Sequence, residues 1–169
     1  MEEVTEEVTR SSLVTNVRIR DFRASDLEAA FELDQVCFEP DIAYTRGQLR
    51  FFLSRANASG LVAETADRLA GFAIGHRSGE RGHIVTIDVA AKQRRLGVGR
   101  VLLTEMVRRL ERSGARRIRL EVDLRNVGAI RFYQTMGFRE SRRLGGYYGR
   151  GLDGLEMVKE PGTGSEGLQ

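Results

Sequence analysis

The most informative segment of the sequence reads Gln93-Arg94-Arg95-Leu96-Gly97-Val98-Gly99-Arg100, and it lies between a predicted strand and a predicted amphipathic helix. Glycines 97 and 99 remove side chains from the tight turn that joins the two elements. The N–H groups of that turn and of the first helical turn then point outward together, at the positive end of the helix dipole. Such a concavity can bind a pyrophosphate, and the arginines would add positive charge around it. A glycine-containing helix start without a ligand is the alternative.

Hydrophobic patterning on both sides of this segment predicts a mixed α/β domain built around one central sheet. Apolar and alternating runs predict seven strands, at 17–22, 60–65, 70–76, 83–89, 117–124, 138–144 and 155–159. Helical periodicity predicts four helices, which gives the order β-α-α-β-β-β-α-β-α-β-β. Their start and stop signals are Ser25-Asp26, Thr45, Gly97, Ser113-Gly114, Asn126 and Gly137.

The length and composition fit one globular domain. The chain has 169 residues, of which 41% are hydrophobic and 30% are charged, and this composition argues against wholesale disorder. Its 27 Lys+Arg against 24 Asp+Glu give a net charge of +3, a balance that does not by itself indicate nucleic-acid binding. We expect the folded domain to span residues 16–160, with a disordered N-terminal tail over 1–15 and a flexible C-terminal tail over 161–169.

The cysteine count bears on disulfides and structural metal sites, and the apolar runs bear on the cellular location of the protein. Cys37 is the only cysteine, so no internal disulfide can form, and no Cys/His cluster is available for a structural zinc. The acidic N-terminal residues contain no apolar signal segment, and no apolar run approaches the roughly 18 residues that span a bilayer. We therefore expect a soluble, cytoplasmic protein that needs no metal.

Two separated motifs together resemble the acetyl-CoA signature of the GNAT acetyltransferases. Arg94-x-x-Gly97-x-Gly99 is similar to its R/Q-x-x-G-x-G/A half. Leu120-Glu121-Val122-x-x-x-Asn126-x-x-Ala129-Ile130-x-Phe132-Tyr133-x-x-x-Gly137-Phe138 looks like its second half. The resemblance is greatest to protein N-terminal acetyltransferases, of the bacterial ribosomal-protein-alanine type and the archaeal type. It implies an α/β (α+β) GNAT fold over about residues 17–159, with a mixed central sheet of about seven strands flanked by about four helices.

The resemblance implies an acetyl-CoA site along the fourth strand and the glycine segment. Residues 87–89 would lie along the pantetheine arm, with the Val89 N–H available to the thioester oxygen. Backbone donors of residues 94–100 would hold the pyrophosphate, Asn126 would hydrogen-bond the cofactor arm, and Tyr133 would lie near its sulfur. The implied cofactor-binding residues are Ile87, Asp88, Val89, Arg94, Arg95, Leu96, Gly97, Val98, Gly99, Arg100, Asn126 and Tyr133.

The resemblance also implies three catalytic residues for direct transfer of the acetyl group to an amine, in a ternary complex without an acyl-enzyme. Glu121 matches the base of the bacterial alanine enzymes, and a carboxylate can deprotonate an α-amino group, whose pKa is about 7.7–8.0. His83 lies where some archaeal and eukaryotic relatives place a second candidate base. Tyr133, a phenol with an ordinary pKa of about 10, can protonate the leaving thiolate, and the Val89 N–H can stabilise the oxygen that becomes negative.

Each of these side chains also has an ordinary structural explanation. Glu121 lies on the polar face of its strand among two arginines and an aspartate, where most glutamates form solvated salt bridges. Tyr133 can be a core aromatic residue beside Phe132, and His83 can be merely exposed or packed. The motif favours the catalytic roles for Glu121 and Tyr133, and leaves the two explanations of His83 in balance.

Two predicted loops resemble the substrate-binding loops of the N-terminal enzymes. One is residues 38–44 between the first two helices, and the other contains Tyr147-Tyr148 between the last two strands. Their aromatic residues and Glu39 can clamp an extended peptide and attract its ammonium group, with ordinary loop packing as the alternative. The chain lacks the tryptophan of the bacterial alanine enzymes, so a broader N-terminal range than alanine stays open. The implied substrate-binding residues are Phe38, Glu39, Tyr44, Tyr147 and Tyr148.

Two other functions are compatible with the sequence. A GNAT enzyme with the same acetyl-CoA site can acetylate a small-molecule amine or a lysine side chain. A basic RNA-binding module is the second, because residues 92–119 hold ten Lys or Arg side chains against Glu105 and Glu111. No RNP-type aromatic motif or helix-turn-helix pattern accompanies this stretch, so a solvated helix face beside a phosphate site explains it more simply. We therefore expect a protein or peptide N-terminus as the acceptor, with a ribosomal protein among the candidates, and no membrane or nucleic-acid partner.

Overall fold

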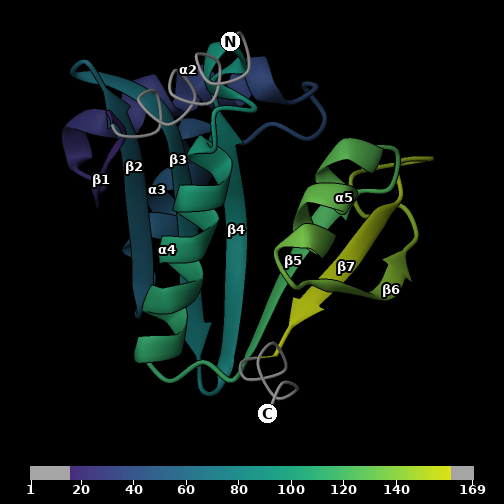
Figure 1. The fold of residues 1–169 in the computed structure, drawn as a ribbon. Coiled ribbons are helices and arrows are strands. Elements are labelled where there is room, and N and C mark those ends of the chain that lie inside the picture. Colours follow the sequence, from purple (N-terminus) through teal and green to yellow (C-terminus); the bar gives the residue numbers. More distant parts are fainter. Residues whose placement is uncertain (1–15, 161–169) are drawn as a thin grey trace, which may run out of the picture.

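The computed structural model describes residues 16–160, which form a seven-stranded sheet with four α-helices packed on it (Figure 1). The strand order is β1-β2-β3-β4-β5-β7-β6, and every neighbouring pair is antiparallel except β4 and β5. The strands are β1 (Arg18–Asp21), β2 (Ala58–Thr65), β3 (Arg68–Ser78), β4 (Arg81–Val89), β5 (Arg117–Asp123), β6 (Arg139–Leu144) and β7 (Gly154–Lys159). The helices are α2 (Leu27–Cys37), α3 (Arg46–Ser54), α4 (Val98–Arg112) and α5 (Val127–Thr135), with short 3-10 turns η1 (Ala24–Asp26) and η2 (Ala91–Gln93).

The helices cover both faces of the sheet. In Figure 1, α4 and α5 lie in front of the strands, and α2 and α3 lie behind them. The larger core is on the α4 side, where Leu102 and Met106 are fully buried and Phe132 of α5 packs at the edge. A smaller core on the other side contains Leu49 of α3 and Phe72 of β3. The apolar stripes that predicted the helices therefore face the sheet.

β4 and β5 are paired only at their first residues and then diverge (Figure 1). The pairing covers three positions, the last of which joins His83 to Arg119. Just beyond it, the register between β3 and β4 shifts by one residue, which leaves Val85 as an extra residue on β4. Because a β-bulge bends the strand that contains it, this bulge explains why β4 leaves β5 at this position.

Three of the four predicted helix starts are confirmed. The side-chain oxygens of Thr45 and Asn126 each accept a backbone N–H from the first turn of their helices, at 3.1 Å. Gly97 precedes α4 with a φ of 85°, in the left-handed region that glycine adopts without strain.

The start of α2 differs from the prediction. The η1 turn precedes it, and the Asp26 side chain makes no hydrogen bond with the first turn of α2. Its carboxylate instead accepts the Arg23 N–H at 2.7 Å and pairs with Arg20 at 2.8 Å. Arg20 also pairs with Glu64 of β2 at 2.5 Å. A charge-assisted bond to arginine is stronger than a neutral cap, so Asp26 ties the helix start to the sheet.

The predicted fold class is confirmed, since the seven strands and four helices occur in the predicted order. No strand boundary lies more than two residues from its predicted position. The predicted tails, 1–15 and 161–169, lie outside the described residues. Within residues 16–160, no helix has the length and apolar character needed to cross a membrane.

Candidate active site

The glycine segment forms a concave turn at the start of α4. Arg95 and Gly97 have positive φ angles of 68° and 85°, whereas Leu96 between them does not, an alternation that turns successive N–H groups to one side. The Val101 N–H makes a helical bond to the Gly97 carbonyl at 3.1 Å, so the N–H groups of residues 98–100 have no acceptor within the helix. No side chain of the described residues caps this helix start. The turn therefore presents backbone donors at the positive end of a 15-residue helix, as an anion site requires.

The three arginines of the segment have different positions. Arg94 turns back toward β4, where its Nε donates to the Val89 carbonyl at 3.1 Å and its Nη2 lies 3.4 Å from the Cys37 sulfur. Arg95 and Arg100 are exposed beside the turn. The partners of the Arg94 guanidinium, a carbonyl and a thiol, leave its positive charge in place, so its role beside a phosphate stays a prediction, as it does for Arg95 and Arg100.

The apolar residues of the segment anchor it to the core. Val98 is fully buried and Leu96 is half-buried. A side chain at Gly99 would contact Val89 and Phe132 at 3.5 and 3.6 Å, so the start of α4 passes close to both β4 and α5. Leu96, Val98 and Gly99 can therefore serve an acetyl-CoA site only through their backbone groups.

The end of β4 presents backbone donors on its β5 side. The Ala90 N–H donates to the Ala70 carbonyl of β3 at 2.8 Å. Hydrogen-bonded pairs alternate along an antiparallel ladder, so the N–H groups of Ile87 and Val89 point to the opposite edge, toward the diverging β5. The predicted thioester-oxygen donor, the Val89 N–H, lies on this edge. Asp88 differs, because its side chain is buried on the α2 side of the sheet and accepts the Thr86 hydroxyl at 2.6 Å.

Glu121 and His83 meet across the diverging strands. The His83 Nε2 lies 2.6 Å from Oε2 of Glu121, and the Arg119 guanidinium pairs with the other carboxylate oxygen. The Glu121 side chain is only 6% exposed, and that of His83 is 17% exposed. Glu121 is therefore not part of a fully solvated salt-bridge face, and the two candidate bases predicted from the sequence form one hydrogen-bonded unit.

His76 packs behind this unit. It pairs with His83 across the β3–β4 hairpin, and the two ring centroids are 5.2 Å apart. Burial, with a smaller contribution from the positive charge of Arg55, lowers the pKa of His76 to about 4. His76 is therefore neutral near pH 7, and it holds one face of the His83 ring.

Tyr133 is partly buried on α5. Its ring contacts those of Phe132 and Phe138, at centroid distances of 5.4 and 6.0 Å. Burial, together with the nearby Asp88 carboxyl, raises the pKa of Tyr133, so its phenol keeps its proton at neutral pH. Asn126, at the start of the same helix, uses its amide oxygen as the cap, which leaves its amide NH₂ as the group able to donate to a ligand.

The predicted substrate loops meet near Glu121. Tyr44 donates from its hydroxyl to the Val85 carbonyl at 3.4 Å, at the bulge of β4. Tyr147 and Tyr148 stack edge to face with their ring centroids 4.8 Å apart. In all three tyrosines burial raises the pKa, and the Glu121 carboxylate raises it further, which places the three phenols within electrostatic reach of that carboxylate.

The other two predicted substrate residues lie nearer the surface. Phe38 is half-buried and ends α2, where its N–H donates to the Asp34 carbonyl at 3.1 Å. Glu39 is exposed and pairs at 3.2 Å with Arg125, which also binds Asp123 at 2.6 Å. The expectation that Glu39 attracts an ammonium group is therefore weakened, because Arg125 already neutralises its charge.

Residues 22–138 match the family described as Acetyltransferase (GNAT) family. The chain belongs to the GNAT acetyltransferases. It is 33% identical over 143 residues to an uncharacterized N-acetyltransferase of Methanocaldococcus jannaschii, covering 84% of this chain and 90% of that protein. It is 28% identical over 157 residues to an N-alpha-acetyltransferase of Sulfurisphaera tokodaii, covering 83% and 91% of the two chains. Identity to the ribosomal protein bS18-alanine N-acetyltransferase of Salmonella typhimurium is 31% over 125 residues, covering 73% and 82%.

Solved structures share the fold of this GNAT acetyltransferase. The crystal structure of Arabidopsis thaliana NAA60 in complex with acetyl-CoA superposes with a TM-score of 0.76 at 24% identity, over 86% of this chain and 98% of that one. In the present GNAT chain, the donors at the start of α4 and along the edge of β4 are the features that an acetyl-CoA pyrophosphate and amide arm require. The residues present therefore fit the donor substrate of the family.

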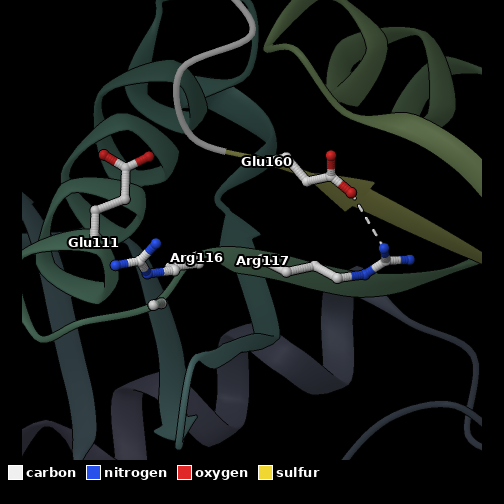
Figure 2. A pocket seen from close by; sticks show the side chains of 5 residues that line it. Glu111, Arg116, Arg117 and Glu160 are labelled. Atoms are coloured by element: carbon white, nitrogen blue, oxygen red, sulfur yellow. Dashed lines mark hydrogen bonds and ion pairs between the residues drawn. The ribbon is translucent and has the colours of Figure 1, made fainter.

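The pocket in Figure 2 lies at the other end of α4 from the glycine turn, beside the first residues of β5. It is lined by Glu111, Arg116, Arg117 and Glu160, among others, and an Arg117–Glu160 ion pair of 3.1 Å crosses it. Its charged residues come from the end of α4, from the start of β5 with the residue before it, and from the residue after β7, and none of them was predicted as a catalytic residue. This pocket is therefore separate from the GNAT site.

Asp34 and His76 lie beside the site but were not predicted as parts of it, whereas Asp88 was predicted only along the cofactor arm. Asp34 and Asp88 are buried together, and His76 supports His83. A signal existed for His76: a tight hairpin around residues 79–80 places positions 76 and 83 opposite each other. No sequence signal joins Asp34 to Asp88, because the helix and the strand meet only through the tertiary fold.

Proposed function

We propose that this GNAT acetyltransferase transfers the acetyl group of acetyl-CoA directly to the free α-amino group of a protein N-terminus. The observation that carries the proposal is the Glu121–His83 unit, a buried carboxylate hydrogen-bonded to a histidine beneath two tyrosine-bearing loops. The names of two relatives, an N-alpha-acetyltransferase and a ribosomal protein alanine N-acetyltransferase, support the same acceptor class.

The Glu121 carboxylate takes the proton of the acceptor amine in this proposal. An α-amino group has a pKa of about 7.7–8.0, so a carboxylate needs only modest driving force to deprotonate it, much less than for lysine at about 10.4. His83 receives or holds the proton next, since its Nε2 shares the 2.6 Å hydrogen bond. Arg119 keeps the carboxylate oriented from its other oxygen.

Acetyl-CoA supplies an activated acyl carbon, and the chain stabilises the charges that its transfer creates. The Val89 N–H, on the free edge of β4, donates to the oxygen that gains negative charge. Tyr133, protonated at neutral pH, gives its proton to the departing thiolate. The backbone donors of residues 97–100 and the exposed Arg95 and Arg100 hold the phosphates.

The acceptor enters between the two tyrosine-bearing loops. Tyr44 comes from the α2–α3 loop, and Tyr147-Tyr148 come from the β6–β7 loop, so an extended peptide would be contacted from both sides. A ribosomal or other cytoplasmic protein N-terminus is the acceptor that we propose. Among the alternatives, RNA binding has the least support, because four arginines of the basic stretch already pair with carboxylates: Arg109, Arg116, Arg117 and Arg119.

The test is a panel of short peptides that differ in their first two residues, with acetyl-CoA and a thiol-release readout. Matched peptides with a blocked N-terminus and an internal lysine, and a polyamine, serve as controls. We expect turnover of free N-termini only. Turnover of the polyamine or of blocked, lysine-containing peptides, without turnover of free N-termini, would replace the proposal with small-amine or lysine acetylation. Thermal stabilisation by RNA but not by acetyl-CoA would indicate a binding module instead.

A further inference from the structure

Two acidic side chains face each other in the interior between α2 and β4. Asp34 is 0% exposed and Asp88 is 1% exposed. One oxygen of each has a donor: Oδ2 of Asp34 accepts the Tyr44 N–H at 2.6 Å, and Oδ1 of Asp88 accepts the Thr86 hydroxyl at 2.6 Å. The other two oxygens, Oδ1 of Asp34 and Oδ2 of Asp88, are buried and receive no hydrogen bond from a donor of residues 16–160.

The two carboxyl groups lie within hydrogen-bonding reach of each other. Two carboxylates at this distance in the interior cannot both be ionised, because burial and mutual repulsion disfavour the second charge. Burial raises the pKa of both groups, and the neighbouring Asp34 raises that of Asp88 further. One proton placed between the two unpaired oxygens makes the protonated oxygen a hydrogen-bond donor and the other oxygen its acceptor.

No other charged group replaces this proton. The titratable and charged groups that face the pair are Arg94 from the loop after η2, Cys37 from α2, Tyr44 from the α2–α3 loop and Tyr133 from α5. Cys37 and the two tyrosines are neutral at pH 7, because burial raises their pKa values. Arg94 is an exposed residue whose guanidinium is bound to the Val89 carbonyl and the Cys37 sulfur. Its positive charge lowers the pKa of Asp88, but burial and the neighbouring Asp34 outweigh this effect.

The pair also joins the two halves of the proposed site. Asp34 binds the backbone of Tyr44, whose hydroxyl reaches the Val85 carbonyl on β4. Asp88 directly precedes Val89, the proposed oxyanion donor. A proton shared between Asp34 and Asp88 therefore fixes the loop that carries Tyr44 relative to the strand that holds the thioester.

We propose that Asp34 and Asp88 share one proton, and that this carboxyl pair is a positioning device that fastens the acceptor loop, residues 38–45, to β4. The shared proton does not depend on the reaction, whereas its effect on the acceptor rests on the proposed function. Neither residue touches the reacting atoms, so their contribution acts through Tyr44 and the end of β4.

The shared proton is tested on the unliganded protein by the melting temperature as a function of pH. A proton bound more tightly in the folded chain stabilises it below the ordinary aspartate pKa, and that contribution is lost as the pH rises through the raised pKa of the pair. In Asp88→Asn the amide supplies the hydrogen at every pH. We expect the melting temperature of Asp88→Asn, relative to the unsubstituted protein, to rise steadily from about pH 5 to about pH 9. A difference that stays constant over this range would overturn the shared proton.

Carboxyl ¹³C shifts of labelled aspartate give a second measurement. The two carboxyl groups titrate as a pair, so we expect the carboxyl resonances of both residues to shift over the same pH range. That range should lie well above the pH at which an ordinary aspartate titrates. In Asp88→Asn no resonance should titrate there. Two independent titrations near about pH 4, the ordinary range, would contradict the proposal.

The positioning role is tested by peptide kinetics with two substitutions of Asp34. Asp34→Asn keeps an acceptor for the Tyr44 N–H and a donor to Asp88, whereas Asp34→Ala removes both. We expect Asp34→Ala to raise the KM for peptide about tenfold, with the KM for acetyl-CoA within about twofold, and Asp34→Asn to restore the peptide KM. Equal peptide KM values in Asp34→Ala and the unsubstituted enzyme, or equal impairment of both variants, would overturn the positioning role.

If the unsubstituted enzyme acetylates no peptide, the proposed function fails, while the melting and ¹³C measurements still decide the shared proton.

Discussion

The Nε2 atom of His83 lies 2.6 Å from Oε2 of Glu121, although the two residues belong to strands that separate at this level. His83 is the last residue of β4 paired with β5, and Glu121 lies two residues beyond its partner Arg119. The hydrogen bond therefore links β4 and β5 next to their last paired residues, where the two strands begin to separate. It joins the two candidate bases at the point where the sheet opens toward the predicted donor and acceptor sites.

Glu121→Gln should lower kcat by roughly 100-fold to 1000-fold, because the amide keeps the size of the side chain but cannot accept a proton. The dissociation constant of acetyl-CoA should stay within about twofold, since Glu121 lies away from the glycine turn. Steady-state kinetics and calorimetry measure the two quantities. Glu140→Gln, on the exposed strand β6, is the matched control, and activity of Glu121→Gln equal to that control would refute the role of Glu121.

Gly97→Asp should weaken acetyl-CoA binding by more than about tenfold, because it adds a side chain and a negative charge beside the phosphate donors. Gly114→Asp is the matched control at the other end of α4, where the glycine also has a positive φ, of 114°, and open space around it. Backbone strain should cost both variants about 1–2 kcal/mol of unfolding free energy, and only Gly97→Asp should lose affinity. Similar affinities in the two variants would argue against the phosphate site.

Tyr133→Phe should lower kcat about 10-fold to 100-fold while leaving the melting temperature nearly unchanged, because the ring remains packed between Phe132 and Phe138. The raised pKa of Tyr133 keeps its proton in place through the alkaline range, so the enzyme should not lose activity near the ordinary tyrosine pKa of about 10 through this group. The pH profiles of both proteins test this. A fall in melting temperature as large as the fall in rate would assign Tyr133 to the core alone.

His76→Gln should make the protein less sensitive to acid. The pKa of His76 is lowered to about 4 in the folded chain, so the unfolded chain takes up the proton first as the pH falls below about 6.5. The folded state therefore loses stability between about pH 6.5 and about pH 4, by at most roughly 3 kcal/mol. Urea unfolding at several pH values measures this slope. An identical slope in the substituted protein would show that His76 does not contribute to it.

The sequence predicts most of this fold because its elements have strong local signals. The capping side chains of Thr45 and Asn126 and the left-handed Gly97 mark helix starts that the structure reproduces. Asp26 is the exception, since its carboxylate binds Arg20 of β1, which is held in turn by Glu64 of β2. Local signals give element starts, whereas an ion pair that a capping residue makes with a neighbouring strand cannot be seen in a sequence pattern.

The candidate site was predictable only where a motif carried it. The motif singled out Glu121, His83 and Tyr133, and the structure brings the first two into contact. It gave no indication that Arg94 would turn toward Val89, because that depends on the path of the loop after η2. Nor could it reveal the carboxyl pair, which exists only once α2 has packed against β4.

Strand β6 forms one open edge of the sheet, and its backbone groups on that side have no strand beside them within residues 16–160. An open edge is a template on which another chain can add a strand, the first step of aggregation. Five of its six residues are exposed, and most of these carry a charge: Arg139, Glu140, Arg142 and Arg143. A second molecule that approached this edge would have to desolvate those charges, so β6 protects the enzyme from uncontrolled self-association.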